Sequence, residues 1–310
     1  MNNIKYTKHI LSKENQEEIE GIERIVNNLS EKWPSDIEFP IIFFIEKLSP
    51  HLFLDAFPSL KVETIRPLTV AGQILGTSIV MCDSIIDKEN DVFLTTKYSL
   101  SFQVMLLEAY NILYSIFPKE SRFWEFFRKC YYEYIDACIT EKKFASGEFP
   151  FSEYTEELAL KIAANKSAIA KVNIAGLVEL AKDDSLFEPL TEAVKQYLIA
   201  RQIWDDISDW KEDLQSGTPS LLLSRVVQEW PIKCDETMLK KISRKIFYGG
   251  NINYVIELAC QSLERAKELT KDIPELAWRS VAVEELQNHF DSLSQNIEKI
   301  CLKNIQSLAK

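Results

Sequence analysis

Aspartate recurs at every fourth position of one stretch, as Asp205, Asp209 and Asp213, and this spacing constrains the fold more than any other feature. Positions four apart lie on one face of an α-helix, and the flanking apolar residues also follow helical spacing. Like charges stacked in this way repel by about 0.2–0.5 kcal/mol per pair when exposed, and by more where water is excluded. No Lys or Arg lies between them on that face. A cation with a preference for oxygen ligands, such as Mg²⁺, would relieve the repulsion; a solvated acidic face is the alternative.

A second acidic pair lies far upstream. Asp83 and Asp87 are again four residues apart, and they end a long apolar run from Ile65 to Ile86. This spacing predicts a helix that leaves apolar surroundings just where the acids begin. Two such acidic helix ends would suit two walls of one pocket, in which metal ions hold a diphosphate.

The fold class follows from glycine usage and apolar periodicity. The 310 residues contain only 8 Gly, far below the average of about 7%. Few Asn-Gly or Asp-Gly turns separate alternating apolar runs, so the sequence predicts long helices with short joints. We expect a single all-α domain over residues 1–310, with residues 1–12 poorly ordered. The expected helices are 14–32, 35–48, 51–57, 61–88, 98–117, 121–145, 154–181, 187–214, 221–229, 235–247, 252–271 and 273–307.

Charge and composition exclude several functional classes. The net charge of −11 and the lack of a Lys/Arg run argue against nucleic-acid binding. No run reaches about 18 apolar residues and the N-terminus is polar, so we expect a cytoplasmic protein without stable membrane insertion. The 6 cysteines show no disulfide spacing, and the 3 scattered histidines make a zinc site or a His-based triad an unfavoured interpretation.

Taken together, the motifs resemble the class I isoprenoid synthase superfamily, specifically the trans-prenyl diphosphate synthases and the related terpene cyclases. The resemblance covers roughly residues 60–230. Arg66-Pro-Leu is similar to the Arg-Pro-Leu that leads into the first aspartate-rich motif, and Asp83-Ser-Ile-Ile-Asp87 is similar to that DDxxD motif, with Ser in second place. Lys166-Ser resembles the Lys-Thr pair of the family, and Gln202-Ile-Trp-Asp-Asp-Ile-Ser-Asp209 resembles the second motif, QxxDDxxD.

The resemblance implies a helical bundle around a central cavity, a prenyl diphosphate substrate and Mg²⁺, with three ions when substrate is bound. It also implies a homodimer. The metal ligands would be Asp83, Asp87, Asp205, Asp209 and Asp213, and Lys166 would join them in the catalytic set by contacting the diphosphate. Substrate-binding residues would be Lys166, Gln202, Arg66, Ser78, Trp204, Tyr98 and Phe102. The three rings are candidates for guiding an allylic cation through cation–π contacts, with ordinary core packing as the alternative for each.

The departures from the family pattern bear on the reaction. Val62-Glu-Thr-Ile precedes Arg66 where chain-elongating members carry Gly-Lys-Arg, and no Arg-Arg follows Asp87. Gly217-Thr218 also stands where the family has Gly-Lys. Because an unpaired phosphate charge in a dry pocket is very costly, a second diphosphate lacks support. We therefore expect a terpene synthase (cyclase), a carbon–oxygen lyase that ionises one prenyl diphosphate.

Chain length and rival functions complete the expectations. In prenyl synthases a bulky residue about five positions before the first motif closes the pocket floor, and Ser78 stands there. The small side chain favours geranylgeranyl over farnesyl diphosphate. The alternatives are a prenyltransferase, either chain-elongating or condensing head-to-head like squalene and phytoene synthases, an inactive regulatory subunit, and a helical scaffold. All five acids are present, which argues against the regulatory subunit.

Overall fold

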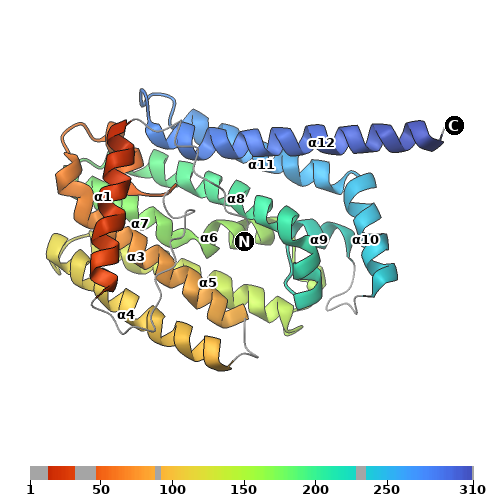
Figure 1. Cartoon of the computed structure of the whole chain (residues 1–310), viewed down its shortest axis with the longest axis horizontal. Coiled ribbons are helices and arrows are strands. Elements are labelled where there is room, and N and C mark those ends of the chain that lie inside the picture. The colour runs from red at the N-terminus through yellow and green to blue at the C-terminus, as the bar shows by residue number, and fades with distance from the viewer. Residues whose placement is uncertain (1–12, 32–46, 88–91, 228–234, 309–310) are drawn as a thin grey trace. The chain divides into compact units, whose positions relative to one another are not determined.

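The computed structural model describes residues 13–31, 47–87, 92–227 and 235–308, and within them every regular element is a helix (Figure 1). The all-α prediction is confirmed. The chain divides into two compact units that interleave in sequence. The first unit comprises Met1–Arg128, Ile169–Leu190 and Asp272–Ala282, and the second comprises Lys129–Ala168, Thr191–Lys271 and Val283–Lys310. The single-domain expectation stays a prediction.

The first unit is built around the long helix α3, Val62–Asp87 (Figure 1). Its neighbours are α1, Lys13–Ser30, the 3₁₀ turn η1, Pro50–Ala56, α4, Val92–Ile116, and α7, Val172–Ala181. Segment Val62–Ile86 has the length and composition of a membrane-crossing helix, and 50% of its most apolar window is buried within the structure. The apolar character of α3 is therefore largely used in packing.

Helices α3 and α7 approach closely because glycines lie at their contact. A Cβ atom built on Gly176 of α7 would lie 2.6 Å from Cδ2 of Leu68, and one built on Gly72 of α3 would lie 2.7 Å from Oδ1 of Asn173. Asn173 is held in place by a hydrogen bond from its Nδ2 to the carbonyl of Leu48, at 2.8 Å. Gly72 of α3 and Gly176 of α7 thus serve close helix packing.

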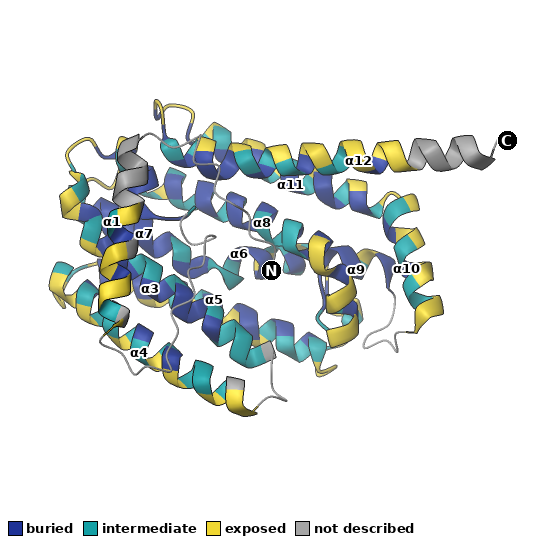
Figure 2. Ribbon diagram, in the orientation of Figure 1, coloured by how far each residue is buried: buried dark blue, intermediate teal, exposed yellow. Residues whose placement is uncertain are grey.

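Helix α4 is less buried than its composition predicts. The apolar run suggests a central helix with all sides covered, yet Leu100, Leu107 and Tyr114 are 56%, 63% and 56% exposed. Figure 2 shows exposed residues recurring along α4, while its other face packs on α3. The sequence did not reveal this because a uniformly apolar helix carries no polar stripe to mark its outer side.

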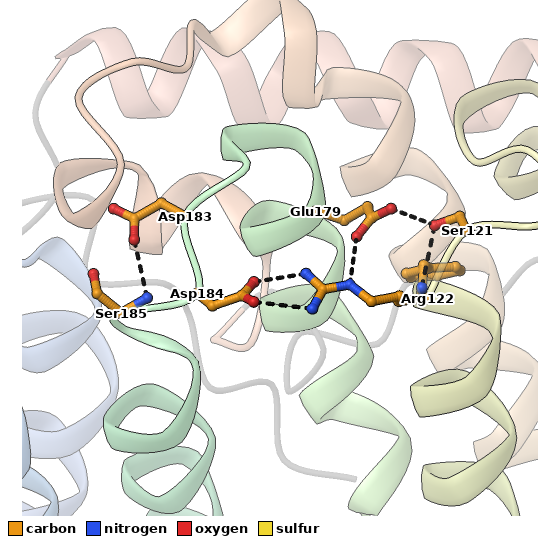
Figure 3. Close-up of polar contacts among 7 residues, drawn as sticks. Ser121, Arg122, Glu179, Asp183, Asp184 and Ser185 are labelled. Atoms are coloured by element: carbon orange, nitrogen blue, oxygen red, sulfur yellow. Dashed lines mark hydrogen bonds and ion pairs between the residues drawn. The ribbon is translucent and has the colours of Figure 1, made fainter.

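A polar cluster ties the start of α5, Phe123–Ala145, to the end of α7 and the joint after it (Figure 3). Arg122 donates two parallel hydrogen bonds to Asp184, at 2.9 and 2.8 Å, and its Nε lies 3.9 Å from Glu179. Ser121 donates to the other oxygen of Glu179 at 2.7 Å. Because Arg122 is exposed, these contacts fix local geometry more than they add stability.

Within its described residues, the second unit contains the remainder of α5 and six further α-helices, two of which, α11 and α12, run side by side (Figure 1). A cluster of three side chains joins its helices. Tyr254 donates to Glu156 at 2.9 Å, and Arg225 lies 3.6 Å above the Tyr254 ring while pairing with Glu156. The helices are α6, Glu156–Lys166, α8, Phe187–Ser216, α9, Leu221–Val226, α10, Glu236–Tyr248, α11, Asn251–Leu269, and α12, Glu285–Leu308.

Three predicted boundaries were wrong. The helix expected over 154–181 is interrupted between α6 and α7 by the 3₁₀ turn Ala168–Lys171, where the chain passes from the second unit to the first. Helix α4 starts at Val92, before the predicted residue 98, and the last helix begins with a π-helical turn at Arg279. No Gly or Pro marks the first two points, so tertiary packing decides them, whereas Pro274 precedes the third. Most of the helix expected over 35–48 and the segment 1–12 lie outside the described residues.

The close α3–α7 contact gives a stability prediction. We expect Gly176→Ala to destabilise the protein by about 1–3 kcal/mol, because the added methyl group has no space beside the buried Leu68. Gly21→Ala in α1 is the matched control, since nothing lies within 4 Å of its Cβ position. That change should stabilise by about 0.5–1 kcal/mol. Urea unfolding measures both, and equal stability of the two variants would contradict the close contact.

Candidate active site

Helix α8 carries the three regularly spaced aspartates, as the sequence predicts. It is continuous over Phe187–Ser216, so Asp205, Asp209 and Asp213 lie one turn apart on one helix. Asp205 and Asp213 are half-buried and Asp209 is exposed. One face of the helix is apolar and buried, which explains why it forms and which way it faces. The buried residues are Tyr197, Leu198, Ile203, Ile207, Trp210 and Leu214.

The carboxylates of α8 repel one another in partly dry surroundings. Burial raises the pKa of Asp213 to about 8, and the charges of Asp206 and Asp209 contribute to the rise. Burial also raises the pKa of Asp205, an effect that Arg201 partly offsets. Arg201 lies one turn before Asp205 and forms an ion pair with it. The acidic face therefore has a cation at its start, outside the Asp205–Asp213 stretch. The remaining acids lack such a partner on their own helix.

Lys166 lies beside this acidic face. It is the last residue of α6, and its Nζ lies 2.9 Å from Oε2 and 3.1 Å from Oε1 of Glu141 on α5. The positive charge of Lys166 lowers the pKa values of Asp205, Asp206 and Asp213. The predicted diphosphate-binding lysine and the predicted metal ligands of α8 therefore share one site in the second unit.

Glu141 is a site residue that the sequence reasoning missed. Its side chain is buried, only 7% of the residue being exposed, on a helix face that is otherwise apolar. The signal was available in the sequence, because an acid within an apolar i, i+3, i+4 pattern marks a charge that needs a buried partner. The apolar members of that pattern are Tyr134, Ala137, Cys138 and Phe144.

Asp206, next to the first aspartate, has a different environment. It is 6% exposed, and its two oxygens accept hydrogen bonds from Gln202 Nε2, at 2.9 Å, and from the backbone N–H of Leu221, at 3.0 Å. Burial raises its pKa to about 7, against the effect of these two hydrogen bonds. Gln202, predicted to bind substrate, thus donates to a neighbouring carboxylate one turn along α8.

Trp204, predicted as a ring for the allylic cation, contacts α12. Its ring lies edge-on to Phe290, with centroids 5.4 Å apart, and 5.3 Å from the ring of His289. Because Phe290 is fully buried, Trp204 contributes to packing between α8 and α12. Core packing was the alternative that we weighed for each aromatic candidate.

The remaining predicted residues lie in the first unit. Asp83 is half-buried in the last turn of α3, and Asp87 is the final residue of that helix, with a side chain outside the described set. Ser78 is fully buried and donates to the carbonyl of Leu75 at 2.6 Å. Arg66, Tyr98 and Phe102 are each half-buried, on α3 or α4. The pairing of the two aspartate clusters across one pocket stays a prediction.

The donor set suits a hard cation that also binds a ligand. The acids that lie near Lys166 offer carboxylate oxygens, the donors that Mg²⁺ and Ca²⁺ prefer. Among the residues that the structure describes, no group of three or more His, Cys, Asp or Glu side chains is arranged to hold a metal ion. Mg²⁺ commonly takes one or two carboxylates and completes its shell with waters and substrate phosphates. The residues therefore fit Mg²⁺ bound together with a diphosphate better than a closed protein cage.

Comparison with known proteins finds relatives by structure only. No protein-family model and no curated protein matches the sequence. The chain is similar to the geranylgeranyl pyrophosphate synthetase of the archaeon Geoglobus acetivorans, with a TM-score of 0.68 and 20% identity over 89% of this chain and 97% of that one.

Two bacterial structures with bound ligands are also similar. A polyprenyl synthase from Caulobacter crescentus, complexed with calcium and isoprenyl diphosphate, gives a TM-score of 0.67 and 14% identity over 89% of this chain and 94% of that one. A geranylgeranyl pyrophosphate synthase from Corynebacterium glutamicum, complexed with isoprenyl diphosphate and magnesium, gives a TM-score of 0.63 and 14% identity over 88% of this chain and 90% of that one. At these identities the likeness shows a shared all-α fold.

The electrostatics of α8 predict how stability depends on pH. The usual pKa of an Asp is 3.8, and in the folded protein the pKa is raised to about 7 at Asp206 and about 8 at Asp213. Between these values the folded state holds protons that the unfolded state releases, so the stability of the metal-free protein falls as pH rises. We expect the melting temperature in EDTA to fall from about pH 5 to pH 8, and less steeply in Asp213→Asn. Gln215→Ala, an exposed change on α8 that removes no titratable group, should keep the wild-type slope; an Asp213→Asn slope equal to wild type would contradict the assignment.

Proposed function

We propose that this chain, which has the fold of the class I isoprenoid synthases, is an enzyme that binds a prenyl diphosphate and cleaves its allylic carbon–oxygen bond. The observation that carries the proposal is the partly buried acidic face of α8 with Lys166 beside it. Two structures of the same fold were solved with an isoprenyl diphosphate and a divalent cation, calcium in one and magnesium in the other. The same ligand chemistry accounts for the charge pattern of this site.

The aspartates of the two helices would bind the metal ions. Asp205, Asp209 and Asp213 would hold Mg²⁺ on α8, and Asp83 and Asp87 would hold it on α3. When bound, the cations neutralise the negative charge that grows on the leaving diphosphate as its oxygen takes the electron pair of the broken bond. The ordered position of this acidic face, prepared before substrate arrives, means that little reorganisation is needed at the moment of reaction.

Lys166 would contact the diphosphate directly. In the substrate-free protein it pairs with Glu141, which keeps the ammonium group beside the acids. A diphosphate brings more negative charge than one carboxylate, so the ammonium group can turn to it while Glu141 stays within reach. The pair thus holds Lys166 close to its working position at a small cost in side-chain entropy.

Prenyl transfer is the first candidate for the fate of the allylic cation. The three similar structures are prenyl or polyprenyl diphosphate synthases by their descriptions, which favours the prenyltransferase alternative over our main expectation of a cyclase. The terpene synthase interpretation is the second candidate. It is favoured by Val62-Glu-Thr-Ile65 and by Gly217-Thr218, which replace the basic residues that would bind a second diphosphate. The small Ser78 favours geranylgeranyl over farnesyl diphosphate as the substrate of a terpene synthase.

The metal assignment predicts a loss of activity without a loss of fold. Asp209 is exposed, so Asp209→Asn leaves the packing of α8 unchanged. We expect this variant to lower kcat for Mg²⁺-dependent pyrophosphate release by about 100-fold or more, with wild-type helical circular dichroism. Gln215→Ala, at an exposed position on another face of the same helix, should keep wild-type turnover. Full activity in Asp209→Asn would remove α8 from the metal site; Asp83→Asn tests the first unit in the same assay.

The two candidate reactions differ in their products. Purified protein with Mg²⁺ is incubated with geranyl, farnesyl, geranylgeranyl or geranylfarnesyl diphosphate, with and without isopentenyl diphosphate. For prenyl transfer, a longer prenyl diphosphate should form only when isopentenyl diphosphate is present. A hydrocarbon released from the single substrate would instead establish the terpene synthase, and a product of twice the carbon number a head-to-head condensation. No reaction with any substrate would contradict the proposed function.

A further inference from the structure

The turn between α8 and α9, Gly217–Ser220, is anchored by two buried side chains from outside it. The phenolic O–H of Tyr154 donates to the carbonyl of Pro219 at 3.3 Å, and Asp206 accepts the backbone N–H of Leu221 at 3.0 Å. Tyr154 is 7% exposed and Asp206 6% exposed, so both contacts lie where water competes poorly. A turn that would otherwise be free to move is fixed at its end.

Both oxygens of Asp206 are engaged by the protein, and Asp206 is buried where Asp205 is half-buried and Asp209 is exposed. One oxygen accepts from Leu221 and the other from Gln202, at 2.9 Å, and both donors are neutral. Removal of this carboxylate would leave the buried N–H group of Leu221 without its acceptor, which costs about 1–3 kcal/mol. Asp206 therefore differs in kind from Asp205 and Asp209 on the same helix.

The anchored turn adjoins the acidic face. The carbonyl of Asp213 accepts the backbone N–H groups of Gly217 and Thr218, at 3.0 and 2.9 Å, and Gly217 turns the chain with a φ of +80°. The charges of Asp206, Glu141 and Asp213 all act on the hydroxyl of Tyr154. Any shift of the turn would therefore move the end of α8 that carries Asp213.

We propose that Asp206 is a positioning residue. Together with Tyr154, it holds the Gly217–Ser220 turn and the C-terminal end of α8 in a fixed position relative to Lys166. This inference rests on the proposed function, because it concerns how the same site is held ready for a cation and a diphosphate. It separates the neighbouring aspartates by role. Asp205 faces the ligand, and Asp206 faces the protein.

Hydrogen exchange tests the anchor whether or not the enzyme turns over. Asp206→Ala removes the acceptor for the Leu221 N–H, and we expect its amide to exchange at least about 10-fold faster. Asp206→Asn keeps an acceptor oxygen, and a flipped Gln202 amide can accept from the new amide group, so exchange should stay near wild type. Tyr154→Phe should speed exchange at Gly217 and Thr218 and serves if Asp206→Ala fails to fold. Unchanged exchange in both Tyr154→Phe and Asp206→Ala would overturn the anchor.

Ligand binding then separates positioning from metal ligation. Calorimetric titration of inorganic pyrophosphate in excess Mg²⁺ gives Kd for wild type, Asp205→Asn, Asp206→Asn and Asp206→Ala. Loss of a group that orients ligands typically weakens binding by about 10–100-fold, and we expect Asp206→Ala to fall in this range. Asp206→Asn should rescue binding to near the wild-type Kd, while Asp205→Asn should not. Equal losses in Asp206→Asn and Asp205→Asn would make Asp206 a metal ligand and overturn the proposal, while no binding by wild type would count against the proposed function alone.

Where turnover is measurable, the same variants give a second readout. A misplaced turn should raise KM for Mg²⁺ and for the prenyl diphosphate more than it lowers kcat, because Asp206 itself touches no reacting atom. A loss confined to kcat in Asp206→Asn would contradict a positioning role.

Discussion

Repulsion between carboxylates held partly away from water is the constraint on which the second unit depends. Helix α8 places Asp205, Asp206, Asp209 and Asp213 within nine residues, and burial makes the charges of Asp205, Asp206 and Asp213 more costly than in solution. The protein offsets this only in part, with Arg201 at the start of the face and Lys166 beside it. The repulsion that these two cations leave uncompensated destabilises the protein without ligand, and it favours any ligand that brings positive charge. A metal-bound diphosphate is such a ligand, so the same interaction links stability to function.

The acids of this site are satisfied in two different ways. The carboxylate of Asp206 is stabilised by hydrogen bonds from two uncharged donors, a side-chain amide and a backbone N–H, and so belongs to the supporting structure. Glu141 is paired with Lys166 and keeps that cation in place. Asp205, Asp209 and Asp213 are left on the more accessible side. A site with this division has its supporting hydrogen bonds complete before a ligand binds, which is how geometry within a fraction of an ångström is maintained.

The first unit depends on a close approach of backbones. Gly72 and Gly176 let α3 and α7 come together, and Asn173 fills the remaining space while bonding to Leu48. This packing consumes much of the apolar surface of α3, the helix that ends in Asp83 and Asp87. The position of those two acids is therefore set by a long, packed helix and not by a loop.

Local periodicity was sufficient to predict most helices and the alignment of Asp205, Asp209 and Asp213, because helical spacing depends only on near neighbours in sequence. Tertiary structure decided the rest. The interruption between α6 and α7 has no Gly or Pro to announce it, and the exposed side of α4 has no polar stripe. The partners that give the site its character are 15 positions apart for Asp206 and Leu221, 25 for Glu141 and Lys166, and 65 for Tyr154 and Pro219. Such contacts exist only after the helices have packed, so no pattern within a single helix could have identified the partners of Asp206, Glu141 and Tyr154.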